Sequence, residues 1–508
     1  MGGICFLLLL TFLCRGAAHS GPSNAAVMFA STDEVEETKL SVTGVIPHWL
    51  SGTLIRNSPA GYENGADEMR HMFDAWAKLN MWKIKDGEVT HQSQYLNSTS
   101  YAMAVETASI SQEGYGTPKN PGKRTPGERD DDAAKRSSNQ IPSPRLRRDT
   151  AIRDNRPPSS SRRVAGGDDP NDRFMVNPMV NVWKFDDKYM ATTDQNLYIE
   201  FDAATGDVLG DVNAAFDQTS DPITAKGVQA LAAAHPRYDR FLRQHYNVEM
   251  DLKPKGAEVL HKPATYNVWR YNETGEAYAP GETLPPREII ASFSSDDASY
   301  VHSFALSEKY VVIVQCPFTY DFATLMTSDV IEDSTTWNEK GHTTVHVIDR
   351  NSGEILQQIT DDGAPWFIYH ALNAYDDGEE VVVHLSRYDN STLIDFGMKL
   401  ENIVDEPKLY VPTYTQARLN ECRVNVRTGA LKCEEVVGDT FEMATFNWVD
   451  KHMQQPQYAW AANMASPNTP WSDGESDWID QIVKVDLSSK AVVGSWKQEG
   501  AYNCEVGF

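Results

Sequence analysis

Three histidines share one kind of sequence setting and could together bind a metal ion. His235 lies in LAAAHPRYD, His302 in SYVHSFALS and His370 in PWFIYHALN, each at the end of a predicted turn or the start of a predicted strand. The separations of 67 and 68 residues are nearly equal. Imidazole nitrogen suits zinc, copper, iron and nickel. A histidine in such a setting can equally be a hydrogen-bonded core residue, and the spacing leaves both interpretations open.

Strand pairs recur along the chain and would have to position these histidines. In six segments, β-branched and aromatic residues alternate around a Gly or Ser turn, which predicts hairpins. The segments are residues 81–93, 197–210, 267–279, 345–358, 422–435 and 482–496. Evenly spread hairpins favour a β-propeller, in which equally spaced residues lie at equivalent depths on successive blades. A pair of β-sandwich domains is the alternative.

Charge and composition narrow the class of protein. The 508 residues carry a net charge of -26, which argues against a nucleic-acid partner. Residues 118–172 are instead basic, rich in Pro, Gly, Ser and Arg, and nearly free of apolar side chains. Such a segment cannot bury enough apolar surface to offset its ordering entropy, so we predict a disordered insertion between two strands. The stretch Arg145–Arg148 within it matches a dibasic processing site. In a segment so rich in arginine, a chance match is the alternative interpretation.

The N-terminus predicts entry into the secretory pathway. The apolar run from Ile4 to Cys14 is too short to span a bilayer as a helix, and small residues follow it. We therefore predict a signal peptide over residues 1–20 and a secreted or lumenal protein, with an intracellular protein as the alternative. Glycosylation sequons at Asn97, Asn272 and Asn390 agree with secretion.

Two cysteines flank the predicted turn of residues 422–435. Cys422 and Cys433 could form a cross-strand disulfide in an oxidising compartment. They could equally remain free and behave as small apolar residues.

Five segments resemble motifs of the carotenoid cleavage oxygenase family, particularly its animal branch of β-carotene oxygenases and the retinoid isomerohydrolase. They are GTLIRNSPAGYENG (52–65), RHMFDAWAKLNMWKIKDGEVT (70–90), AHPRYD (234–239), SYVHSFALSEKYVVIV (299–314) and YHALNAYDDGEEVVVHL (369–385). They occur in the family's order, and such a collinear set is more specific than any single motif. The resemblance implies an all-β, seven-bladed β-propeller over residues 35–508, with a small helical and loop cap.

The resemblance also implies an iron centre. In the family four histidines bind Fe(II), and His235, His302 and His370 match the first three, which makes them the expected catalytic metal ligands. Glutamates orient three of the family's histidines, and Glu442 and Glu505 match two of these. Asp194 occupies the third position and is one methylene shorter. We expect this difference to loosen its histidine or to require a small backbone shift.

The implied function is an Fe(II)-dependent oxygenase. It would use O2 to cleave a C=C bond of a carotenoid or apocarotenoid into carbonyl products. The polyene substrate would occupy an apolar tunnel, and peripheral membrane contact would aid its uptake. The alternatives are a retinoid isomerohydrolase and a non-catalytic carotenoid- or retinoid-binding protein on the same scaffold.

The fourth histidine of the family has no counterpart in this sequence. In the family it follows the segment that matches Tyr502 to Phe508, where this sequence ends. We therefore expect a fragment whose last blade is incomplete. A short spliced form that only binds substrate and replacement of the ligand by His452 are the alternatives.

Overall fold

The computed structural model describes residues 29–123, 174–209, 215–217, 220–223, 230–252, 264–405, 417–463 and 481–497. The predicted signal peptide, most of the predicted insertion, Arg148 and Glu505 lie outside the described residues.

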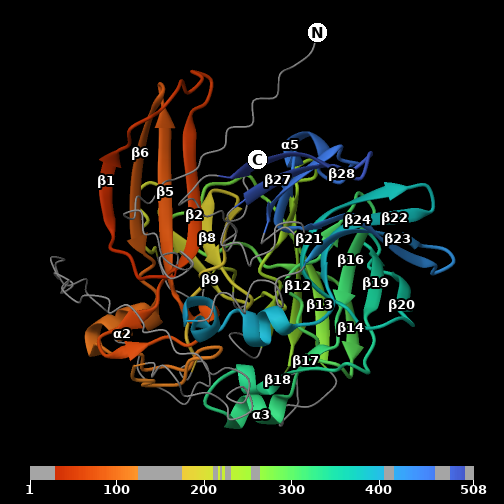
Figure 1. The fold of residues 1–508 in the computed structure, drawn as a ribbon, viewed down its shortest axis with the longest axis horizontal. Helices are drawn as coiled ribbons and strands as arrows, with labels where there is room; N and C mark the ends of the chain where they lie inside the picture. Colours follow the sequence, from red (N-terminus) through yellow and green to blue (C-terminus); the bar gives the residue numbers. More distant parts are fainter. Residues whose placement is uncertain are drawn as a thin grey trace, which may run out of the picture.

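Six antiparallel sheets follow one another along the described chain and form the blades of a β-propeller (Figure 1). In spatial order, the first blade contains β1 (Val35–Lys39), β6 (Glu88–Tyr95), β5 (Trp76–Lys85) and β2 (Gly52–Gly61), and the second contains β7 (Asn181–Phe185), β8 (Lys188–Thr192) and β9 (Tyr198–Phe201). The third contains β10 (Ala230–Ala232), β12 (Gln244–Asp251), β13 (Ala264–Asn272) and β14 (Glu288–Ser295), with β11 (Arg237–Asp239) paired to β12, and the fourth contains β15 (Ala305–Leu306), β16 (Tyr310–Gln315), β19 (Thr344–Asp349) and β20 (Ile355–Thr360). The fifth contains β21 (Phe367–Asp377), β22 (Glu380–Tyr388), β23 (Arg418–Asn425) and β24 (Leu431–Thr440), and the sixth contains β25 (Glu442–Phe446), β26 (Tyr458–Asn463), β27 (Gln481–Asp486) and β28 (Ala491–Lys497). The all-β class and the propeller arrangement are confirmed, and a seventh blade stays a prediction.

Short helices and two small strand pairs connect the blades. They are α2 (Thr99–Thr107), α3 (Phe322–Thr327), α5 (Trp448–Lys451), the 3₁₀ turns η1 (Met72–Asp74) and η4 (Glu332–Ser334), the π-helical turns η5 (Leu393–Gly397) and η6 (Glu401–Asp405), and the pairs β3 (Glu63–Asn64) with β4 (Asp67–Glu68) and β17 (Phe318–Tyr320) with β18 (Thr335–Trp337). The α2 and α3 helices both lie at the lower edge of the view in Figure 1. Among the described helices, none has the length and apolar character needed to cross a bilayer.

Four of the six predicted hairpins are confirmed: β5–β6, β19–β20, β23–β24 and β27–β28. The β5–β6 turn shows why the local sequence sufficed. Lys85 pairs with Glu88, so Asp86 and Gly87 alone form the turn, and their φ angles are 52° and 82°. A two-residue hairpin of this kind needs positive φ at both positions, and Asp-Gly meets that need at low cost.

The prediction for residues 267–279 is wrong, and that for 197–210 holds only in part. In the latter, a single bridge joins Phe201 to Val208. After β13, the chain is held by the β7–β8 turn, because Asp186 accepts a hydrogen bond from the Gly275 amide at 2.7 Å. Asp187 likewise accepts one from the Tyr278 amide at 3.1 Å. The partner of β13 is therefore β14, which comes from further along the chain.

The predicted cysteine pair forms a disulfide within the fifth blade. Cys422 of β23 lies opposite Cys433 of β24, and their sulfur atoms are bonded. Of the two arrangements that the sequence left open, the structure has the disulfide.

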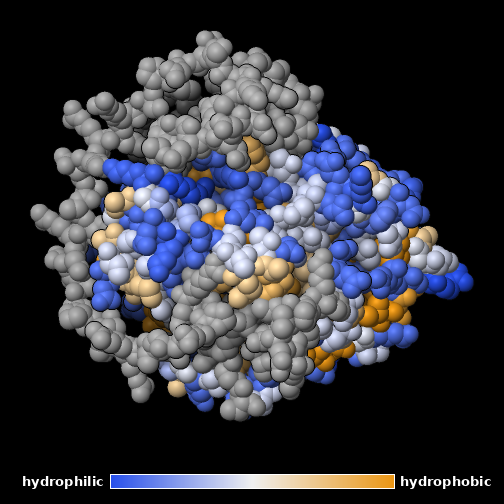
Figure 2. Space-filling view, turned by 90° about the horizontal axis from the view of Figure 1, so that it is seen from below, coloured by the Kyte–Doolittle hydropathy of each residue, from blue (hydrophilic) through white to orange (hydrophobic). Residues whose placement is uncertain are grey.

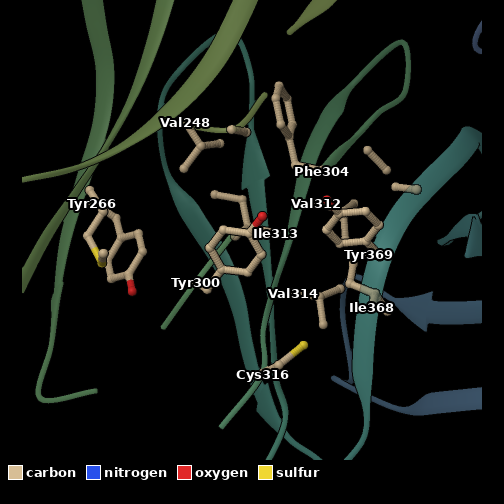
Figure 3. Packing of buried hydrophobic residues seen from close by; sticks show 14 of the residues in the cluster. Val248, Tyr266, Tyr300, Phe304, Val312, Ile313, Val314, Cys316, Ile368 and Tyr369 are labelled. Atoms are coloured by element: carbon tan, nitrogen blue, oxygen red, sulfur yellow. The ribbon is translucent and has the colours of Figure 1, made fainter. Parts of the chain in front are cut away.

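The largest apolar cluster lies in the middle blades, where the histidine-bearing segments run. Figure 3 shows part of it, with Tyr300, Phe304 and Tyr369 beside Val312 and Val314 of β16. All five side chains are buried. The outside of the molecule is different: on the face in Figure 2, hydrophilic residues cover much of the described surface, with smaller apolar areas between them. Burial of the middle blades gives the histidine segments a rigid support.

Candidate metal centre

The three predicted histidines meet at one point. His235 lies between β10 and β11, His302 precedes β15, and His370 lies within β21. The Nε2 atom of His235 is 3.0 Å from that of His302 and 3.2 Å from that of His370. The three residues come from the third, fourth and fifth blades. Their nearly equal spacing along the chain thus corresponds to similar positions on successive blades. Among the described residues, these three form the group that could hold a metal ion.

Asp194 and Tyr300 hold the His302 ring. The Nδ1 atom of His302 lies 2.7 Å from Asp194 Oδ1, and Tyr300 donates its hydroxyl to Asp194 Oδ2 at 3.1 Å. Burial, followed by the charge of Asp194, raises the pKa of Tyr300 well above its usual value, so the phenol keeps its proton. Despite its shorter side chain, Asp194 therefore reaches His302, and the Tyr300 hydroxyl fixes the direction of the carboxylate.

Glu442 holds the His370 ring. It is the first residue of β25, and its Oε2 atom contacts both His370 Nδ1 and the backbone N–H of Met443. The Glu442 side chain is 2% exposed. A buried carboxylate with hydrogen bonds from both a ring and the backbone leaves the imidazole little freedom to rotate.

Ring stacking adds a further restraint on His302. The ring of Tyr369 lies 3.9 Å from it, centroid to centroid, with an interplanar angle of 7°. Tyr369, which Figure 3 labels, directly precedes His370. One segment of β21 therefore supplies His370 and also packs against His302.

The donor set fits a bound metal ion. Because His302 and His370 donate their Nδ1–H groups to carboxylates, their Nε2 atoms carry lone pairs. The Nε2 atom of His235 faces both of these lone pairs and can carry at most one proton. That proton cannot make a full hydrogen bond to both lone pairs, whereas a metal ion could bind all three nitrogens. Nitrogens bound at about 2.1 Å and at right angles lie ~3 Å apart, close to the distances between these rings.

Electrostatics point the same way. Burial, then the nearby His302 and His370 rings, keep the pKa of His235 well below its usual value, so its ring is neutral. Neutral imidazole is the form that binds metals. Asp194 and Glu442 bring two carboxylates to the cluster, and a divalent cation would balance carboxylate charge there.

A cavity adjoins the cluster on the side of the Asp194 carboxylate. It has a volume of about 80 Å³ and is lined in part by Asp194 and Tyr300. Apolar and aromatic side chains make up much of the remaining wall, including Phe73, Met175, Leu231, Phe318 and Ile394. This volume is well below the roughly 300–1,000 Å³ of typical small-molecule sites, so the described cavity would enclose only part of a long ligand.

The structure separates the remaining predicted residues. His452 lies beside Tyr238 and Arg237 and is not part of the histidine group, and burial lowers its pKa to about 4. Tyr300 was missed by the sequence reasoning, although a signal exists. It stands two residues before His302, a spacing that puts side chains on one face of an extended segment.

The fold and the site together define a class: a β-propeller in which three successive blades bring together three histidines that could hold a metal ion. The family model described as Retinal pigment epithelial membrane protein matches residues 28–506. The chain therefore belongs to this family, and the resemblance to the carotenoid cleavage oxygenases is confirmed.

Its relatives include animal carotenoid enzymes. The β,β-carotene 15,15'-dioxygenase of Rattus norvegicus is 27% identical over 523 residues, which cover 94% of this chain and 80% of the relative. That of Mus musculus is 27% identical, covering 71% of this chain and 57% of the relative. The mitochondrial carotenoid-cleaving dioxygenase of Mustela putorius furo is 27% identical, covering 76% and 63%. The chain thus spans less than two thirds of the mouse and ferret relatives.

Solved structures show the same fold. Cobalt-substituted Synechocystis ACO superposes with a TM-score of 0.66 at 15% identity, over 92% of this chain and 82% of that one. An ACO/RPE65 chimera superposes with a TM-score of 0.65 at 16% identity over the same shares.

Proposed function

We propose that the protein is an Fe(II)-dependent oxygenase that cleaves a C=C bond of a carotenoid or apocarotenoid with O2, giving two carbonyl products. The observation that carries the proposal is the convergence of three histidines, two of them held by buried or partly buried carboxylates. Kinship with enzymes named carotenoid dioxygenases supports the reaction class.

His235, His302 and His370 would hold the iron through Nε2. When bound, ferrous iron supplies the redox chemistry that O2 requires. The protein's part is to keep the rings oriented. Asp194 and Glu442 accept the Nδ1 protons, while Tyr300 and Tyr369 prevent the His302 ring from turning.

The apolar side chains in the wall of the cavity beside Asp194 are compatible with an apolar substrate such as a polyene. Its apolar and aromatic wall would bind a hydrocarbon chain and exclude water from the reacting bond. The proposal includes peripheral membrane contact for substrate uptake, because carotenoids partition into lipid rather than water.

The test combines metal binding with product analysis. The purified chain, loaded anaerobically with Fe(II), is given β-carotene or an apocarotenal under O2, and aldehydes are separated by chromatography. We expect one equivalent of iron and aldehyde products. His302→Ala should remove both the iron and the activity, since it deletes a ligand.

His384→Ala is the matched control for that variant. His384 is as buried as His302 but lies on β22, outside the histidine group. The His384→Ala variant should be less stable than the parent and should still bind iron. If His302→Ala cleaves the polyene at the parent rate, the assignment of the centre is wrong.

A non-catalytic carotenoid- or retinoid-binding protein is the second candidate. Tight polyene binding without aldehyde products, by a chain that contains iron, would identify this function. Conversion of a retinyl ester to an isomerised alcohol without O2 would instead identify an isomerohydrolase.

The proposal also places the protein in the secretory pathway. The side chains of Asn97, Asn272 and Asn390 are all exposed, and Cys422 and Cys433 are paired. Expression in animal cells should give secreted protein whose electrophoretic mobility increases after N-glycosidase treatment. Retention in the cytosol with no mobility change would contradict this placement.

A further inference from the structure

A guanidinium group connects the segments that carry all three histidines. Arg237 lies two residues after His235, and its Nε atom donates to the Phe304 carbonyl at 2.8 Å. Its Nη2 atom donates to Ser303 Oγ at 3.0 Å and to the Ala371 carbonyl at 2.5 Å. Phe304 and Ser303 follow His302, and Ala371 follows His370. One side chain thus joins the backbones of three blades next to the histidines.

Ser303 completes this connection. Its Oγ atom also accepts a hydrogen bond from the Ala371 amide at 3.1 Å, and the residue is 2% exposed. A backbone bond from the Ala234 amide to the His302 carbonyl, at 2.9 Å, joins the first two segments on the other side of His235. The relative positions of the three rings therefore depend on polar contacts one or two residues away from them.

We propose that Arg237 and Ser303 are positioning residues that set the mutual geometry of the three histidines, and through it the affinity of the centre for Fe(II). The inference rests on the proposed function, in that it takes the cluster to be an iron site. Neither residue belongs to the histidine group or to the lining of the described cavity. Their role is to keep three blades in register at the depth where the Nε2 atoms converge.

The shape of the side chain matters as much as its charge. The guanidinium is a planar fork that donates in fixed directions, so Nε and Nη2 can serve acceptors on two blades at once. A lysine ammonium has no such fork. Arg237→Lys therefore keeps the positive charge near His235 and removes the geometric restraint.

The experiment measures metal affinity directly, with Co(II) as the probe. Visible absorption of Co(II) reports both binding and ligand geometry. Arg237→Lys should weaken binding about ten- to a hundredfold, the usual effect of losing a partner that supports metal ligands, and should change the absorption bands. Ser303→Ala, which removes a hydroxyl and adds nothing, should weaken binding about two- to tenfold in the same direction.

Arg423→Lys is the matched control. Arg423 on β23 also donates three hydrogen bonds, to Asp377, Glu380 and Glu421, in an outer part of the fifth blade. Its loss should lower the melting temperature of the metal-free protein and leave Co(II) affinity and spectrum unchanged.

The outcomes separate the two proposals. If the parent chain binds neither Co(II) nor Fe(II), the proposed function fails. If the parent binds Co(II), and Arg237→Lys and Ser303→Ala bind it with parent affinity and spectrum, only the positioning role is wrong. A lower melting temperature with unchanged affinity would assign Arg237 to general stability, as for Arg423, and would also overturn the inference.

Discussion

Two carboxylates hold histidines of the candidate metal centre with different side chains. We call Asp194 with Tyr300 and His302 the Asp194 arm, and Glu442 with Met443 and His370 the Glu442 arm. In the Asp194 arm, a short carboxylate with 19% exposure reaches His302 and is itself held by the Tyr300 hydroxyl. In the Glu442 arm, a longer carboxylate with 2% exposure contacts His370 and the Met443 amide. The comparison teaches that the Tyr300 hydroxyl can compensate for the shorter side chain of Asp194 by holding its carboxylate in place. Glu442 instead reaches His370 through the greater length of its own side chain.

Among changes to the two arms that leave the histidines in place, Glu442→Gln should have the largest effect. The amide oxygen can still accept from His370, but the new NH2 group replaces Glu442 Oε1, which lies buried without a hydrogen-bond partner. An unsatisfied buried donor costs about 1–3 kcal/mol. We expect iron affinity to fall about ten- to a hundredfold, measured by competition with a chelator. An affinity equal to that of the parent would show that His370 needs no carboxylate.

Asp194→Asn should have a smaller effect. The Asp194 carboxylate lines the cavity, so an amide there can find water, and its oxygen can still accept the Nδ1 proton of His302. We expect a loss of iron affinity of about two- to tenfold, in the same chelator competition. A loss greater than that of Glu442→Gln would reverse our ranking of the two arms.

Tyr300→Phe should be milder still for affinity but should identify the role of the hydroxyl. The carboxylate remains and loses one hydrogen bond, which is worth about 0.5–1.5 kcal/mol. Combined with Asp194→Asn, the two losses should not add, because both act through His302. Simple additivity in this double-mutant cycle would mean that Tyr300 acts independently of Asp194.

The smallest effect on iron affinity is expected from a change at His346, which lies outside both arms and instead affects stability at low pH. Burial lowers the pKa of His346 to about 4, below the value of about 6.5 in an unfolded chain. The unfolded state therefore binds a proton that the folded state does not, and stability is lost as the pH falls from about 6.5 to 4. For one group the slope is about 1.4 kcal/mol per pH unit.

His346→Gln should remove that slope and leave iron affinity unchanged. A glutamine can still donate to Gln315, whose Oε1 atom lies 2.6 Å from His346 Nε2. Urea unfolding of parent and variant at pH 5 and pH 7.5 provides the measurement. An unchanged pH slope would mean that other buried groups, such as His71, control acid stability.

Local sequence was sufficient wherever a turn or a strand depends only on its neighbours. Asp86–Gly87 and the Cys422–Cys433 strand pair were predicted because turn residues and alternation act within a few positions. The segment after β13 was predicted wrongly because Asp186 and Asp187, almost a hundred residues earlier in the chain, hold it. No local pattern contains that information.

By itself, the sequence determined the all-β class, four hairpins and the histidines at equal spacing, because periodicity and turn chemistry are local properties. The resemblance added the carboxylate positions, and the structure places Asp194 and Glu442 on the rings of His302 and His370. Only the tertiary structure decided how Tyr300 completes a shortened carboxylate and how Arg237 joins three blades. Those contacts form between residues far apart in the chain, and distances between such atoms are fixed only when the blades pack around a common axis.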